Sequence, residues 1–248
     1  MTTGNPLDIP HGGSCTWQLP PDATSASLAR SLLTSAMTAL AFPGETIDDA
    51  VLAVSETTTN VYTHCLRSGT YDPASSPELW IWSRTQPEPH LIVGVFDTCR
   101  DTLPEPSTGD LLEENGRGLG IINTLTAAWG SRPTRSRLAA WPIPGKLVWF
   151  TVPLPCTWPR TRPTIDPAYT AQRFHALLTA RGIDGIIRND QAGVSLLAIP
   201  GNLNLWVYPD RFTLDDPTGT STTRPLQDLH DLTETVITHL EHLTTKTA

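Results

Sequence analysis

The stretch ELWIWSRTQPEPHLIVGVFD (residues 78–97) carries the strongest structural signal in this chain. Its first part, residues 78–84, alternates aliphatic residues with tryptophans, which is the two-residue period of a β-strand. Its second part, residues 90–97, is an apolar run that ends on Asp97 and predicts a second strand. The run GKLVWFTVPL (145–154) is equally rich in β-forming residues, so we expect it to add a third strand to the same sheet.

Helical segments precede and follow these strands in the sequence. Residues 25–42 place leucines at helical spacing and stop at a Pro-Gly pair, and residues 46–64 form a second predicted helix. Residues 114–130 combine a glycine-rich entry with an apolar helical face that includes Trp129. We therefore predict an α/β protein, more specifically an α+β sandwich in which a mixed sheet is covered on one face by helices.

The composition restricts the function classes. The chain has 248 residues and a formal net charge of −8, which disfavours general binding to nucleic acid because phosphate contacts need clustered cations. It shows neither a leader-like N-terminus nor an apolar run of about 20 residues, so we expect no membrane segment. The four cysteines are far apart and form no CxxC pair, which favours reduced thiols and a cytoplasmic location.

Changes in composition divide the chain into four parts. Residues 1–14 are expected to be a flexible tail, and residues 15–155 to form the main domain. Residues 156–167 are rich in proline and predict a stiff linker. Residues 168–246 predict a small α/β domain in which a meander of three or four strands lies between two helices. No catalytic cluster is visible in this last part, and we expect it to serve protein contacts or dimerisation.

The predicted helix 46–64 carries Glu56, Asn60 and His64 at a strict spacing of four, which places all three on one face. A carboxylate and an amide at this spacing also occur by chance on many solvated helices. Two further features give the pair a context: Asp97 at the end of an apolar strand, and the sequence GRGLG (116–120) at the entry to a helix.

These features together suit the binding of ATP and Mg²⁺. The adenine amino group needs an acceptor, which a carboxylate at a strand end can supply. Glycines at a helix N-terminus let backbone N–H groups approach phosphates. Magnesium accepts an amide oxygen together with phosphate and water oxygens. A carboxylate one helical turn before such an amide can take a proton from an attacking hydroxyl.

The same arrangement resembles the GHKL (Bergerat-fold) ATPases over roughly residues 14–155. The pair Glu56 and Asn60 looks like their N-box, Asp97 like the aspartate of their first glycine box, and GRGLG like their lid. The resemblance is closer to the bacterial anti-sigma-factor serine/threonine kinases. The further motifs that carry it are Ala29-Arg30, Val54-Ser55-Glu56, Trp129-Gly130 and the strand Gly145 to Phe150.

The resemblance implies that Glu56 is the general base and that Asn60 is the Mg²⁺ ligand. The nucleotide-binding residues that it implies are Asn60, Asp97, Gly116, Arg117, Gly118, Leu119, Gly120 and Lys146. It also implies a regulator of transcription that acts by partner switching, with a sigma factor or an anti-sigma-factor antagonist as the partner, and that forms a homodimer.

The chain departs from the family pattern at several positions. Cys99 stands where a glycine commonly follows the adenine-binding aspartate, and Thr57-Thr58 replace an apolar pair. The run 134–144 before the last strand looks like an insertion. Nucleotide binding is therefore better supported than turnover, and the alternative is a catalytically weak or inactive nucleotide-dependent interaction module.

Overall fold

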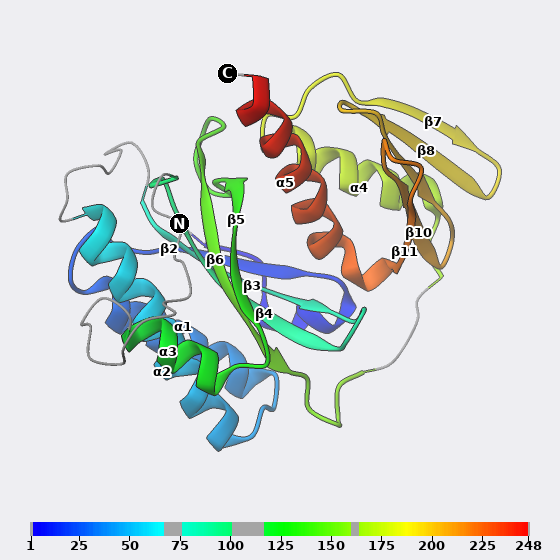
Figure 1. Cartoon of the computed structure of the whole chain (residues 1–248). Coiled ribbons are helices and arrows are strands. Elements are labelled where there is room, and N and C mark those ends of the chain that lie inside the picture. Colours follow the sequence, from blue (N-terminus) through cyan, green and yellow to red (C-terminus); the bar gives the residue numbers. More distant parts are fainter. Residues whose placement is uncertain (1, 67–75, 101–116, 160–163, 248) are drawn as a thin grey trace.

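The computed structural model describes residues 2–66, 76–100, 117–159 and 164–247. Its helices lie against two antiparallel β-sheets, which confirms a mixed α/β protein (Figure 1). The first sheet has the strand order β1-β2-β3-β4-β6-β5, and the second has the order β11-β10-β9-β8-β7. None of the helices in the described part of the chain combines the length and the apolar character that crossing a bilayer requires.

The N-terminal part of the chain supplies the first sheet and its helices, and the C-terminal part supplies the second sheet with two more helices. The first group is β1 (Thr2–Thr3), the 3₁₀ helix η1 (Pro6–His11), β2 (Ser14–Gln18), α1 (Ser25–Ala39), α2 (Gly44–Val61), the π-helical turn η2 (Tyr62–Leu66), β3 (Glu78–Arg84), β4 (His90–Asp97), α3 (Arg117–Leu125), β5 (Trp129–Arg135) and β6 (Pro144–Pro153). The second group is α4 (Pro167–Thr179), β7 (Ile187–Gln191), β8 (Val194–Ile199), β9 (Leu203–Val207), β10 (Arg211–Asp215), β11 (Ser221–Pro225), the 3₁₀ helix η3 (Leu226–Asp228) and α5 (Leu229–Thr247).

Both faces of the first sheet are covered. Because side chains alternate along a strand, β3 directs Leu79 and Ile81 to one face and Trp80 and Trp82 to the other. The aliphatic face joins the core formed with α1 and α2. The tryptophan face belongs to a separate apolar cluster, on the side where α5 contacts β3 and β5. In Figure 1, α1, α2 and α3 lie on one side of this sheet, and α5 lies on the other.

The central strand β4 explains why residues 90–97 read as an uninterrupted apolar run. All eight of its residues are buried, and β3 and β6 flank it in the sheet. A strand that is covered on both faces shows no alternation between polar and apolar residues. Its last residue, Asp97, is therefore a carboxylate at the end of the most buried strand of the sheet.

Three sequence expectations are wrong in detail. Every strand pair of the first sheet is antiparallel, whereas we expected a mixed sheet. The segment expected to be a flexible tail contains β1 and η1, because Ile9 is fully buried and its carbonyl accepts a hydrogen bond from Ser83. Trp129 and Gly130 lie in β5 and not in a helix, since β5 pairs with β6 over its whole length.

The second sheet is a five-strand meander packed on α4 and α5. It has one strand more than the longest meander we expected, because Ser221–Pro225 pairs with β10. Its core includes Phe174 of α4, Phe212 of β10 and Ile237 of α5. Since α5 contacts this core and the first sheet alike, it joins the two sheets, and the predicted domain boundary at residues 156–167 stays a prediction.

Candidate functional site

The candidate site is built around Asp97 at the C-terminal end of β4. Its side chain is 1% exposed, so its carboxylate lies in a nearly dry environment. The antiparallel register of β4 and β6 places Lys146 directly opposite Asp97. Lys146 is itself buried, and its Nζ atom lies 2.8 Å from Asp97 Oδ1. The pairing of two strands therefore brings together a carboxylate and an ammonium that are 49 residues apart in the sequence.

The chain continues from Asp97 in a tight turn that adds further contacts. The backbone N–H of Cys99 donates to Asp97 Oδ1 at 2.8 Å. The Lys146 ammonium donates to the carbonyl oxygen of Cys99, so it bridges the carboxylate and the backbone of the same turn. Both interactions fix the direction in which the carboxylate points.

The π-helical turn η2 extends α2 and brings Cys65 to the same place. The Cys65 thiol donates to Asp97 Oδ1 at 3.3 Å, and Lys146 Nζ lies 3.9 Å from its sulfur. Wide turns of this kind at the end of an α-helix often mark functional positions. Burial, followed by the Asp97 charge, raises the pKa of the Cys65 thiol far above its usual range. The thiol is therefore protonated at neutral pH.

The two oxygens of Asp97 have different surroundings. Oδ1 accepts from Cys65, the N–H of Cys99 and Lys146, whereas Oδ2 is buried and has no hydrogen-bond partner among the described residues. Burial raises the pKa of the Asp97 carboxyl, and the Lys146 ammonium opposes that shift. A buried carboxylate oxygen without a partner is costly, and such an atom is a candidate acceptor for a ligand.

Glu56 and Asn60 lie on α2 as expected, whereas His64 lies in the π-helical turn η2 that follows it. Glu56 and Asn60 are half-buried and His64 is exposed. Arg30 of α1 donates to Ser55 Oγ at 2.9 Å, next to Glu56. Since Cys65 directly follows His64 and touches Asp97, the turn η2 at the end of α2 lies beside the carboxylate.

The glycine-rich segment is partly described. Gly116 lies outside the described residues, as do the side chains of Arg117 and Leu119. The backbone from Arg117 through Gly120 is already helical and forms the first turn of α3, which contacts α2. Gly118 lies in this turn, and a Cβ atom at Gly120 would meet nothing within 4 Å. The structure thus places α3 against the helix that bears Glu56 and Asn60.

Gly145 has a clear role in the close approach of β6 to the end of β4. A Cβ atom at this position would lie 2.3 Å from the carbonyl oxygen of Asp97 and 2.5 Å from the Phe96 ring. Only glycine lets Lys146 follow at the register that reaches Asp97.

Cys65 and Cys99 are the site residues that sequence reasoning missed. The thiols and the Asp97 carboxylate form a buried group whose ligand atoms all lie within 4.8 Å of one another. Cys99 stood out in the sequence only as a departure two residues after Asp97. Nothing in the sequence signalled Cys65, because its contact with Asp97 depends on the π-helical turn and spans 32 residues.

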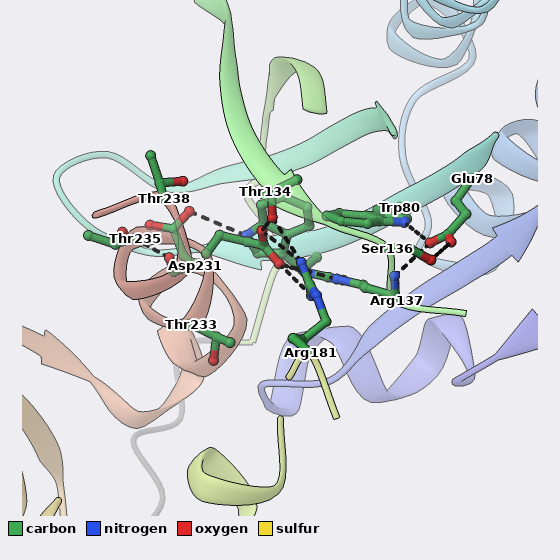
Figure 2. A network of polar contacts seen from close by, with 12 residues as sticks. Glu78, Trp80, Thr134, Ser136, Arg137, Arg181, Asp231, Thr233, Thr235 and Thr238 are labelled. Carbon is green, nitrogen blue, oxygen red and sulfur yellow. Dashed lines mark hydrogen bonds and ion pairs between the residues drawn. The ribbon is translucent and has the colours of Figure 1, made fainter. Parts of the chain in front are cut away.

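A second polar cluster lies on the opposite side of the first sheet, under α5 (Figure 2). Glu234 of α5 is fully buried and forms ion pairs with Arg137 at 2.8 Å and with Arg181 at 3.0 Å. Thr134 donates to its other oxygen at 2.7 Å. The guanidinium of Arg137 also lies over the rings of Trp80 and Trp82. This cluster joins α5 to the tryptophan face of the first sheet.

A scan against models of known protein families finds no match in the chain, and a search of curated proteins likewise finds none. The resemblance to GHKL ATPases therefore rests on the motifs of the sequence alone.

Proposed function

We propose that the chain is a purine-nucleotide-binding regulatory protein that resembles the anti-sigma-factor serine/threonine kinases and acts by partner switching. The observation that carries the proposal is Asp97 Oδ2, a buried carboxylate oxygen at the end of β4 to which no described residue donates. An amino group of a purine would supply the missing donor. The helix α2, which carries Glu56 and Asn60, contacts β4 and α3.

The side chains at this site are of the chemical types that bind adenine and Mg²⁺. Asp97 Oδ2 is an acceptor for the adenine amino group, and the half-buried amide of Asn60 offers an oxygen that suits Mg²⁺. When bound, the ion would offset the negative charge of the phosphates. The chain itself, with a net charge of −8, has no excess of positive charge for this purpose.

Glu56 would act on the protein substrate. It lies one helical turn before Asn60 and is half-buried, so its carboxylate can reach a hydroxyl presented beside α2. Its part is to accept the proton of an acceptor serine. Arg117 and the first N–H groups of α3 would hold the phosphates at the positive end of the helix dipole.

The ion pair between Lys146 and Asp97 favours a second candidate, a catalytically inactive interaction module. Lys146 is predicted to bind the nucleotide, and its ammonium contacts Asp97 and the Cys99 carbonyl. A cation held inside the protein is not directed at phosphates. Under this alternative a nucleotide only orders the region around α3, and function lies in protein contacts.

The partner would be a sigma factor or an anti-sigma-factor antagonist, and homodimer formation and a cytoplasmic location belong to the same proposal. Because α5 covers the tryptophan face of the first sheet, a protein partner would dock elsewhere. Leu28 of α1 and Leu52 of α2 are exposed apolar side chains on the helices that cover the other side of this sheet.

Nucleotide binding is tested by calorimetric titration with ATP and with ITP, which carries a carbonyl in place of the adenine amino group. We expect the wild type to bind ATP about ten to a hundred times more tightly than ITP, which corresponds to one buried hydrogen bond to a charged group. Asp97→Asn should remove most of this preference, and Asn60→Ala should weaken both nucleotides when Mg²⁺ is present. Asp210→Asn, at an exposed position, is the control. Equal affinity of the wild type for ATP and ITP would refute the assignment of Asp97.

The two candidates are separated by phosphate release and by phosphotransfer to co-purified partner proteins. Activity in the wild type that is lost in Glu56→Gln, with ATP affinity unchanged, would identify a kinase. ATP binding without any turnover would identify the interaction module.

A further inference from the structure

The same end of β4 also brings together three side chains that can ligate a metal ion. Cys65, Asp97 and Cys99 are all buried, and one ligand atom of each lies within 4.8 Å of the other two. We propose that Cys65, Cys99 and Asp97 form a binding site for a thiophilic divalent metal ion of the zinc class. The proposal does not depend on nucleotide binding, because it rests on the geometry of these three side chains.

The spacing of the group suits zinc. Two sulfurs bound to one zinc ion at the tetrahedral angle lie about 3.8 Å apart, and a sulfur and an oxygen lie slightly closer. The Cys65 sulfur is 3.3 Å from the Asp97 carboxylate at Oδ1, and the two sulfurs and one carboxylate oxygen of Asp97 all lie within 4.8 Å of one another. Small shifts of the three side chains, with the carboxylate turned to present Oδ2, would therefore bring the groups to coordination distance.

Asp97 provides the independent indication of a ligand. Its Oδ2 atom is buried without a partner in the described part of the chain, and the whole side chain is 1% exposed. Oδ1 can keep its contacts with Lys146 and the N–H of Cys99, which act as outer hydrogen-bond donors that orient the ligating carboxylate. The metal would therefore use the oxygen to which these donors do not bind.

Lys146 makes the charges of such a site balance. On binding, the two thiols release their protons to solvent, which leaves two thiolates and one carboxylate. Their three negative charges are matched by the divalent ion together with the buried Lys146 ammonium, which lies 2.8 Å from Asp97. The filled site is neutral, which a nearly dry environment requires.

The choice of metal follows from the donors. Two thiolates and one carboxylate favour zinc and exclude magnesium and calcium, which prefer oxygen ligands only. Three protein ligands leave a fourth position for water or a small ligand. Because the ion would bind Asp97 Oδ2, it would also compete with a purine amino group for the same atom.

The site is tested by titrating the reduced, chelator-treated full chain with Co²⁺ in the absence of nucleotide. We expect one Co²⁺ per chain, with a thiolate-to-metal charge-transfer band in the near ultraviolet that Zn²⁺ abolishes by displacement. Cys65→Ser and Cys99→Ser should each lose the band, and Cys15→Ser and Cys156→Ser, which change cysteines outside the cluster, should keep it. Absence of the band from the wild type, or its survival in Cys65→Ser and Cys99→Ser, would overturn the proposal.

Because a cysteine variant can lose the band by misfolding, a second measurement uses the wild type alone. X-ray absorption of the zinc-loaded chain should show two sulfur neighbours at about 2.3 Å. A shell of nitrogen and oxygen alone would overturn the site, as would a disulfide between Cys65 and Cys99 that forms in place of metal binding. Failure of this test leaves the ATP and ITP titrations unaffected, and failure of those titrations leaves the cobalt spectrum unaffected.

Discussion

Two buried carboxylates on opposite sides of the same sheet show how differently one chemical group can be used. Glu234 accepts hydrogen bonds on both oxygens, from Arg137, Arg181 and Thr134. Asp97 concentrates its contacts on Oδ1, and no described residue donates to its Oδ2. Both side chains are almost completely inaccessible to water, so the contrast comes from their partners and not from their exposure.

The pKa shifts of the two groups run in opposite directions. Burial acts to raise the pKa of Glu234, but the guanidinium groups of Arg181, Arg137 and Arg132 outweigh it and hold the pKa well below its usual range. Burial also raises the pKa of Asp97, and there the single Lys146 ammonium is not enough to reverse the shift. The several cationic partners of Glu234 outweigh the cost of burying its charge, whereas the single cationic partner of Asp97 opposes that cost without outweighing it.

This difference separates a structural cluster from a candidate site. The Glu234 carboxylate has both oxygens satisfied within the chain and holds α5 against the first sheet, so it offers a ligand no acceptor oxygen. The Asp97 carboxylate keeps an acceptor to which the described residues provide no donor. Stability should therefore depend on the first cluster more strongly than on the second.

The largest effect is expected when the part of the chain that contains α4, the second sheet and α5 is removed. A chain that ends at Pro159 would expose the apolar cluster of Trp80, Trp82, Ile92, Phe96 and Leu147, on the face where α5 now contacts β3. Exposed patches of this kind cause aggregation, so we expect this fragment to be insoluble or to bind a hydrophobic dye strongly. Sedimentation and dye fluorescence measure the outcome. A soluble, monomeric fragment that does not bind the dye would show that the first sheet does not need α5.

The next largest effect is expected from Glu234→Gln. The substitution leaves Arg137 and Arg181 buried without their counter-charge, and guanidinium groups cannot release a proton to escape this cost. We expect the free energy of unfolding in urea to fall by about 3–5 kcal/mol. Asp210→Asn is the matched control, because its ion pair with Arg211 is exposed and should contribute less than about 1 kcal/mol. A loss no larger than that of the control would contradict the role given to Glu234.

The pH dependence of stability should differ in sign between the two carboxylates. Because the pKa of Glu234 is lowered on folding, its contribution is complete above its ordinary pKa of 4.5 and is lost as the pH falls. Because the pKa of Asp97 is raised, its contribution is complete below 3.8 and is lost as the pH rises through the raised value. Urea unfolding between about pH 3 and pH 7 should therefore show that the deficit of Glu234→Gln shrinks toward acid. Asp97→Asn should instead gain stability relative to the wild type toward neutral pH. Parallel curves for the two variants would refute the assignment.

Much of the sheet could be predicted from the sequence because its pattern is strong. The bounds of β3 and β4 agree with the prediction, since alternation and a long apolar run leave little choice of secondary structure. Strand β5 was missed because WGSRPTR contains arginines and a proline and has little strand propensity of its own. It adopts the strand conformation through pairing with β6, which is an effect of tertiary structure.

The candidate site was predictable only in part. The four-residue spacing on α2 and the strand-end aspartate were visible, because both depend on local periodicity. The pairing of Asp97 with Lys146 depends on strand register, and the approach of Cys65 depends on a π-helical turn. Neither property is encoded in a short motif, so the contact between Lys146 and Asp97 was not foreseen and Cys65 was overlooked.

The smallest effect is expected from Lys146→Met, and it follows from the chemistry of the partner that remains. Loss of the ammonium leaves Asp97 buried, but a carboxyl group can take up a proton, unlike the arginines around Glu234. Protonation costs at most about 1.4 kcal/mol for each pH unit above the ordinary value of 3.8. Near pH 5 we therefore expect a loss of about 1–3 kcal/mol, including the lost hydrogen bonds, which is less than the loss caused by Glu234→Gln measured at the same pH. If Lys146→Met proves as damaging as Glu234→Gln under these conditions, then Asp97 is held charged by its surroundings. Its second oxygen would in that case belong to a structural cluster and not to a binding site.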